Sequence, residues 1–106
     1  MTNVIAYCKA KDRATEEHPF RTGTIAFKVD GKAFALMPNE GQDGRITLKC
    51  DPDRAVILRE AYPEITPGYH MNKTHWNTLD LHGKLPEDLV KELIDHSYNL
   101  VDKHQA

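Results

Sequence analysis

The sequence lacks most of the features that mark a specialised class of protein. It has only two cysteines, Cys8 and Cys50, without the spacing of a metal site, so we expect buried free thiols rather than a disulfide framework. No apolar run approaches the roughly 20 residues that a membrane helix needs, and the N-terminus has no apolar signal core. These absences predict a cytoplasmic protein that does not contact a membrane.

Signatures of catalysis are missing as well. The chain contains neither a glycine-rich phosphate loop nor a Gly-x-Ser-x-Gly elbow. His70, His75, Asp80 and His82 are the candidates for acid–base or metal chemistry, but their spacing matches no zinc pattern. We therefore expect no catalytic residues, no metal and no cofactor, and we predict that the protein is not an enzyme.

Neither sign of charge is in large excess. Fourteen basic and sixteen acidic residues leave a formal net charge of −2 at pH 7. This balance weighs against strong non-specific nucleic-acid binding, but it permits a local basic surface. With 106 residues, 40% of them hydrophobic and 28% charged, the chain has the composition of a globular protein. We expect a single domain over residues 1–106, large enough to bury a core.

The hydrophobic periodicity predicts helices over residues 2–11, 52–62 and 86–104, and strands over residues 24–29, 32–37, 45–50 and 76–81. The passage between the first helix and the first strand is polar, and no element is expected there. Asp51-Pro52 predicts the start of the second helix, with a capping carboxylate followed by proline at the first helical position. The predicted buried stripe of that helix is Ala55, Leu58, Ala61 and Tyr62.

Asp30-Gly31 is the clearest local signal in the chain. This pair tolerates the positive φ angles of a type I′ turn, so it predicts a two-residue hairpin between strands 24–29 and 32–37. A regular ladder from this turn sets Phe27 opposite Phe34 and Ile25 opposite Leu36. These four apolar residues share one side of the sheet, and we expect them to lie beneath the helices. The opposite side carries Thr24, Ala26 and Lys28 across from Met37, Ala35 and Ala33, so it is lower, flatter and partly polar.

Hairpin connections make the sheet antiparallel, and the helices have only one bulky sheet face to cover. The sequence therefore predicts a two-layer α+β domain in which helices cover one face of an antiparallel sheet and the other face stays open. The element order is helix, three strands, helix, strand material and helix.

The stretch 67–78 contains the only tryptophan and two of the six histidines. Trp76 has the opposite parity to Leu79 and Leu81, which are expected to face the core, so a regular strand turns the Trp76 ring away from the core. A bulge at the strand entrance would reverse this parity and make the ring a plug at the edge of the core. Both interpretations of Trp76 stay open at this point.

Four segments together carry a resemblance to a known family: Ala14-Thr15-Glu16-Glu17-His18-Pro19-Phe20, the hairpin 27–35, the stretch 67–78 with His75-Trp76, and the final helix from Leu85-Pro86 with Ser97-Tyr98. In their order and spacing these segments resemble the MmcQ/YjbR family. The resemblance implies the order α-β-β-β-α-β-β-α, similar to the secretion-chaperone fold. It also implies DNA binding, by analogy with a phage transcription factor whose open sheet contacts the duplex, and fold-level analogy alone does not establish a function.

The predicted binding surface combines cations with an aromatic ring, as a sequence-tolerant nucleic-acid surface requires. Its candidate residues on the open sheet face and the adjoining stretch are Lys28, Arg45, Lys49, Tyr69, His70, Lys73, His75 and Trp76. From these residues we predict a non-catalytic, DNA-binding protein.

Two other interpretations of the open face remain. Ala26, Ala33 and Ala35 make it flat, and a flat face can bind another protein or a second copy of the chain, as a chaperone-like module does. Outward strand positions are also polar simply because they contact water, and lysines on them prevent sheets from pairing edge to edge.

Overall fold

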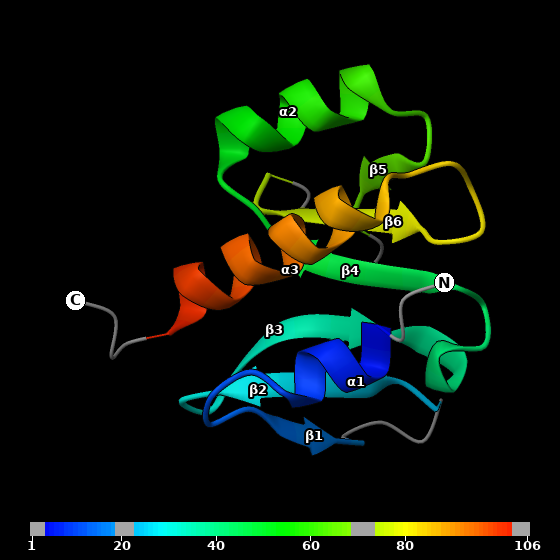
Figure 1. Ribbon diagram of the computed structural model, residues 1–106. Coiled ribbons are helices and arrows are strands. Elements are labelled where there is room, and N and C mark those ends of the chain that lie inside the picture. Colours follow the sequence, from blue (N-terminus) through cyan, green and yellow to red (C-terminus); the bar gives the residue numbers. More distant parts are fainter. Residues whose placement is uncertain (1–3, 19–22, 69–73, 103–106) are drawn as a thin grey trace.

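The computed structural model describes residues 4–18, 23–68 and 74–102 of the chain. Its elements, in chain order, are α1 (Val4–Lys9), β1 (Thr15–Glu17), β2 (Ile25–Val29), β3 (Lys32–Met37), the short 3-10 helix η1 (Pro38–Gly41), β4 (Arg45–Lys49), α2 (Pro52–Ala61), β5 (Ile65–Pro67), β6 (Trp76–Asp80) and α3 (Glu87–Val101). The strands form one antiparallel sheet in the order β1-β2-β3-β4-β6-β5 (Figure 1). No helix in the described part of the chain is long and apolar enough to cross a membrane.

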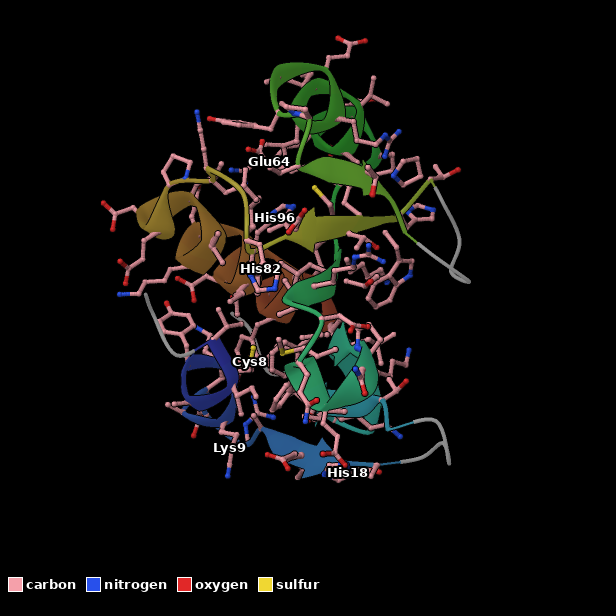
Figure 2. All side chains as sticks on the ribbon, turned by 90° about the vertical axis from the view of Figure 1, so that its right-hand side faces the viewer. Cys8, Lys9, His18, Glu64, His82 and His96 are labelled. Carbon is pink, nitrogen blue, oxygen red and sulfur yellow. The ribbon has the colours of Figure 1, made fainter. Side chains whose placement is uncertain are left out.

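The helices lie on one side of this sheet. Helix α3 crosses β3 and β4, α1 packs beside α3, and α2 covers β5 and β6. Figure 2, turned by 90°, shows α1 and α3 together on the left, with the strands to their right. The core fills the space between the two layers, and its largest fully buried apolar side chains are Phe27, Phe34, Ile46, Leu48, Leu79 and Ile94. The predicted two-layer α+β fold, with an antiparallel sheet and one open face, is confirmed.

Strand β1 is an addition to the predicted order. The sequence indicated only a polar passage there, yet Thr15 pairs with Lys28 and Glu17 pairs with Ala26 along the outer edge of β2. All three residues of β1 are exposed, so its sequence has no alternation of apolar and polar residues from which the strand could be predicted. It forms because β2 offers unpaired backbone groups, and its glutamates then protect the sheet edge.

The predicted hairpin turn is present, but the predicted register holds for only two residue pairs. Asp30 and Gly31 have φ angles of 54° and 79°, as a type I′ turn requires, and Lys28 pairs with Ala33. The next pair is Phe27 with Ala35, so Phe34 is the extra residue of a β-bulge.

The bulge changes which hairpin residues face the helices. Beyond it Ile25 pairs with Met37, and Leu36 pairs with Ala26 on the open face. Met37 and Ala35 are therefore buried in the core, whereas Leu36 is only half-buried. The prediction that Leu36 lies beneath the helices is wrong, and so are the predictions that Ala35 and Met37 face outward.

Phe27 and Phe34 nevertheless lie on the same side of the sheet, as predicted. Their ring centroids are 6.5 Å apart, and the Phe34 ring meets the ring of Tyr98 edge-on at 5.3 Å. Because Phe27 stands opposite the small side chain of Ala35, the two phenylalanine rings pack side by side under α3. Edge-to-face aromatic contacts of this kind stabilise a core beyond their buried area.

At the bulge, Ser97 of α3 supplies the hydrogen bonds that link the backbones of β3 and β4. Its Oγ donates a hydrogen bond to the carbonyl oxygen of Phe34 at 2.5 Å and accepts one from the backbone N–H of Lys49 at 2.9 Å. The side chain is fully buried. A hydroxyl can both donate and accept, so one serine satisfies two backbone groups on neighbouring strands.

Helix α2 begins as the sequence predicts. Asp51 is its N-cap, with Oδ2 accepting a hydrogen bond from the Arg54 N–H at 3.2 Å, and Pro52 follows at the first helical position. In the predicted buried stripe, Ala55 and Leu58 are buried and Tyr62 is half-buried. Ala61 is exposed, so its inclusion in the stripe is wrong.

Two hydrogen bonds between polar groups join the start of α2 to α3. The backbone N–H of Asp51 donates to Nε2 of His96 at 3.1 Å, and Arg54 donates to Glu92 at 2.8 Å. Burial and the positive charge of Arg54 lower the pKa of His96, while Asp51 and Glu92 act in the opposite direction. The folded protein therefore favours a neutral His96 whose Nε2 accepts a hydrogen bond.

We predict that Ser97→Ala destabilises the fold through the two backbone groups that it leaves without a partner. Each unsatisfied buried group costs about 1–3 kcal/mol, so the loss of both should be about 2–6 kcal/mol in urea-induced unfolding. Asn99→Ala on the exposed side of the same helix is the control, with an expected change of at most about 0.5 kcal/mol. Equal losses in the two variants would contradict the bridging role of Ser97.

We also predict that His96 makes the stability depend on pH. A lowered pKa in the folded state means that the unfolded state binds more protons, so this stabilisation is present above the unfolded pKa of about 6.5 and is lost as the pH falls through the folded pKa. His96→Gln keeps a hydrogen-bond acceptor but cannot become charged. Between about pH 7.5 and about pH 5 the variant should therefore lose less stability than the natural protein. Thermal unfolding at both pH values measures the difference, and identical losses would exclude His96 as the source.

Candidate functional site

The open face of the sheet is built from one set of alternating strand positions. Along its middle, one residue from each strand forms what we call the central row: Glu17, Ala26, Leu36, Thr47, Thr78 and Thr66. Thr47 and Thr78 are buried, and their hydroxyl oxygens share a hydrogen bond at 2.9 Å. Except for Glu17 at its end, the central row is flat and neutral.

Trp76 lies on this open face, in the next row of positions. The pairing of β4 with β6 runs without a shift from Arg45–Asp80 to Lys49–Trp76, so no bulge reverses the parity of the tryptophan. Its neighbour Asn77 points to the opposite side, where Nδ2 donates to the carbonyl of Ala55 in α2. Trp76 is half-buried and is not among the described residues that form the core. The interpretation of Trp76 as a core plug is therefore wrong.

Gly68 allows β5 to lie closely against Trp76. The Gly68 N–H donates to the carbonyl of Trp76 at 2.8 Å. A Cβ atom on Gly68 would stand 2.7 Å from the Cβ of Trp76, closer than such atoms approach each other. Any larger residue at position 68 would therefore displace the tryptophan backbone or side chain.

Lys49 is the direct cross-strand partner of Trp76. The two half-buried side chains leave the sheet on the same face, with Cβ atoms about 4.5–5.5 Å apart as for any such pair. Within the described part of the chain, no acidic side chain forms an ion pair with Lys49. We call these two residues the Lys49–Trp76 pair.

His75 lies next to this pair. Its side chain is exposed, and its carbonyl oxygen accepts a hydrogen bond from the N–H of Cys50 at 2.7 Å. This bond fixes the backbone just before β6. His82 follows the other end of β6, where its ring packs over Gly44. His75 and His82 thus lie at opposite ends of β6, whereas the backbone N–H of His82 donates to Oδ1 of Asp80 at 2.9 Å. The described residues contain no group of three or more His, Cys, Asp or Glu that could hold a metal ion.

Lys28 and Arg45 share the open face but have acidic neighbours there. The Nζ of Lys28 lies 3.4 Å from a carboxylate oxygen of Glu17, which the additional strand β1 brings to this face. Arg45 stands directly opposite Asp80. The predicted basic surface is therefore partly neutralised at these two positions. Tyr69, His70 and Lys73, the other predicted site residues, lie outside the described residues.

Asn77 and Arg59 form a polar contact that the sequence interpretation missed. Nη1 of Arg59 donates to Oδ1 of Asn77 at 2.6 Å, and Asn77 is almost fully buried between the sheet and α2. The available signal was parity, since Asn77 occupies an inward position in phase with Leu79. A polar residue in an apolar series indicates a buried hydrogen-bonding role.

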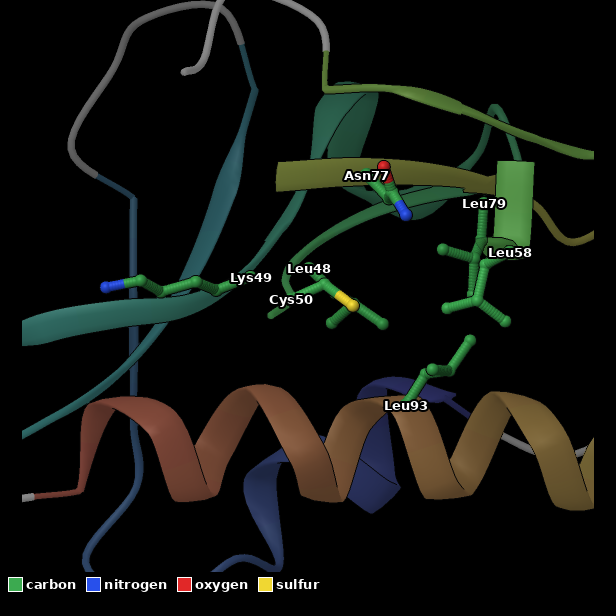
Figure 3. Close-up of a pocket in the computed structure, with 7 residues that line it drawn as sticks. All are labelled: Leu48, Lys49, Cys50, Leu58, Asn77, Leu79 and Leu93. Carbon is green, nitrogen blue, oxygen red and sulfur yellow. The ribbon is translucent and has the colours of Figure 1, made fainter. Parts of the chain in front are cut away.

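A small cavity lies on the helical side of the same strands (Figure 3). It measures about 10 Å³, which is room for at most one water molecule, and it is lined by Leu48, Lys49, Cys50, Leu58, Asn77, Leu79 and Leu93. Burial raises the pKa of the Cys50 thiol, which favours the unreactive neutral form. Cys8 is also a buried free thiol, as predicted, and burial raises its pKa to about 12. In Figure 3 the side chain of Lys49 extends away from the other lining residues.

The chain is similar to several known proteins. It is 40% identical over 83 residues to the uncharacterized protein YbdF of Escherichia coli O157:H7, covering 78% of this chain and 68% of that protein. It is 31% identical over 98 residues to the uncharacterized protein YjbR of Escherichia coli strain K12, covering 92% and 83%. The crystal structure of Deinococcus radiodurans protein DR2400, with a domain named DUF419, matches with a TM-score of 0.87 and 40% identity over 95% of this chain and 77% of that one.

The family model of YjbR matches residues 9–100, which is most of the chain and includes every element from β1 to most of α3. The same segments carry the sequence resemblance described above. The chain therefore belongs to the YjbR family.

Proposed function

We propose that the protein is a non-catalytic, cytoplasmic DNA-binding protein that holds its ligand against the open sheet face. The observation that carries the proposal is the Lys49–Trp76 pair, in which a cation and an indole leave neighbouring strands on the face that the helices do not cover. Cations bind phosphates, and aromatic rings stack on bases. His75 lies beside the pair and adds a further hydrogen-bond donor.

Electrostatics limits how tightly this face binds DNA. The net charge is −2, and Glu17 and Asp80 stand beside two of the three lysine and arginine residues that the structure describes on this face. Only a few phosphate contacts are therefore expected, so the affinity should be modest and should fall with salt in proportion to those contacts.

A second candidate function uses the same face for protein binding. It is favoured by the central row, which is flat and carries a half-buried leucine and a neutral pair of threonines. Such a surface suits another protein or a second copy of the chain. Binding to DNA is the stronger proposal, because a protein surface alone does not explain a lysine paired with an indole.

We predict that Lys49→Ala weakens DNA binding and reduces its salt dependence. A fluorescence anisotropy titration with a labelled oligonucleotide, repeated at several salt concentrations, gives the slope of log K against log salt. Removing one phosphate contact should reduce this slope by about 0.7 for a single strand or about 0.9 for a duplex.

Lys84→Ala is the matched control, because it removes the same charge from an exposed residue in the connection between β6 and α3. Its binding should equal that of the natural protein. A slope near zero in the natural protein, accompanied by self-association in light scattering, would contradict DNA binding and favour the protein-binding candidate.

A further inference from the structure

We infer that the open face selects single-stranded over duplex nucleic acid. This inference rests on the proposed function and names its ligand class. It follows from the shape of the face, from the position of its charges and from the stacking surface of Trp76.

The shape of the face is unsuited to reading a duplex. Proteins read the major groove with an α-helix or a two-stranded ribbon that enters it. The described α-helices α1, α2 and α3 lie on the other side of the sheet, and the β2–β3 hairpin lies within the sheet, paired on both sides (Figure 1). The described residues of the open face therefore include no helix or free hairpin that could enter the major groove, and contact of this face with a double helix depends mainly on bonds to phosphates, in contrast to the duplex contact that the analogy with the phage transcription factor implies.

The charges are arranged unfavourably for that contact. A duplex presents two rows of phosphates, so a flat surface needs cations spread along it. Lys28 lies near one edge of the sheet but is paired with Glu17, and Arg45 stands opposite Asp80. Both acids would face the same phosphates as their partners and would repel them. Among the described cations of this face, Lys49 is the one that has neither an acidic ion-pair partner nor an acidic residue directly across from it.

The Lys49–Trp76 pair fits one nucleotide of a single strand. Trp76 needs the face of a base, and in a duplex those faces are covered by the neighbouring base pairs, whereas a single strand can turn a base outward. Lys49 stands beside the indole at the spacing of a cross-strand pair, so it can bind the phosphate next to the stacked base. One lysine and one ring thus match one nucleotide of a single strand, whereas flat contact with a duplex needs several cations.

The central row gives neighbouring nucleotides room to lie on the sheet but does not recognise their base sequence. The hydroxyls of Thr47 and Thr78 are buried and bond to each other, so they are not directed at base edges. Neighbouring nucleotides can cross this flat row through their sugars and bases. We therefore expect little sequence preference, as is usual for stacking platforms.

The test compares one mixed-sequence DNA strand of about 12 nucleotides with its own duplex, at low salt and in the same anisotropy assay. The single strand should bind at least about tenfold more tightly and should quench the emission of Trp76, which is the only tryptophan. Trp76→Leu should weaken single-strand binding by about 5- to 150-fold while leaving the weak duplex binding nearly unchanged.

Trp76→Phe is the control for a folding defect, because it keeps an aromatic ring that can stack on a base, although a smaller one. It should bind the single strand with an affinity between those of the natural protein and Trp76→Leu. Duplex binding as tight as single-strand binding, or equal affinities in all three proteins, would overturn the inference while leaving DNA binding intact. Failure of both oligonucleotides to bind would instead overturn the proposed function itself, and the inference with it.

Discussion

The β-bulge at Phe34, whose backbone is hydrogen-bonded by Ser97, is the constraint on which the rest of the structure depends. A regular hairpin would turn Leu36 inward and Met37 outward, and Phe34 would stand directly opposite Phe27. The bulge moves Ala35 into that place, so two consecutive residues of β3 face the helices. The Ser97 hydroxyl then satisfies the backbone groups at this position and fixes α3 across β3 and β4. The core and the composition of the open face are thus determined together.

The edge of the sheet beside β2 depends on a second constraint, at Arg13. This residue has a φ of 62°, and its guanidinium binds Asp30 at the hairpin tip at 2.7 Å and Asp102 after α3 at 2.6 Å. The hydrogen bond with Asp102 raises the pKa of Arg13 further above its ordinary value, so the charge is present at every relevant pH. Three distant segments therefore meet where β1 begins. This placement brings Glu17 to the open face and reduces its positive charge.

How far the sequence could predict this molecule depends on the range of each interaction. The hairpin turn was predictable because Asp30 and Gly31 determine it locally. The outward parity of Trp76 was one of two interpretations that the sequence left open, and the unshifted pairing of β6 with β4 decides between them. The bulge was not predictable, since its hydrogen-bond partner Ser97 lies 63 residues away from Phe34. A serine within the apolar stripe of the last helix was the available signal, but a stripe does not identify which backbone groups its hydroxyl meets.

The candidate site divides in the same way. Lys49 and Trp76 could be placed on one face from strand parity, and the structure adds that they are direct partners. The neutralisation of Lys28 could not be predicted, because β1 has three exposed residues and no periodic pattern. Strand β1 forms only because β2 has a free edge, and that edge exists only in the folded sheet. Exposed strands of this kind are the elements that a search for apolar periodicity misses.

The two sheet edges explain why a partner would use the face rather than extend the sheet. On one side β1 is three residues long and carries two glutamates. On the other side β5 is equally short and ends at Pro67, which has no N–H to donate. Short, charged or proline-containing edges discourage the addition of another strand. The proposed ligand is therefore expected to lie on the open face, where the Lys49–Trp76 pair offers both a charge and a ring.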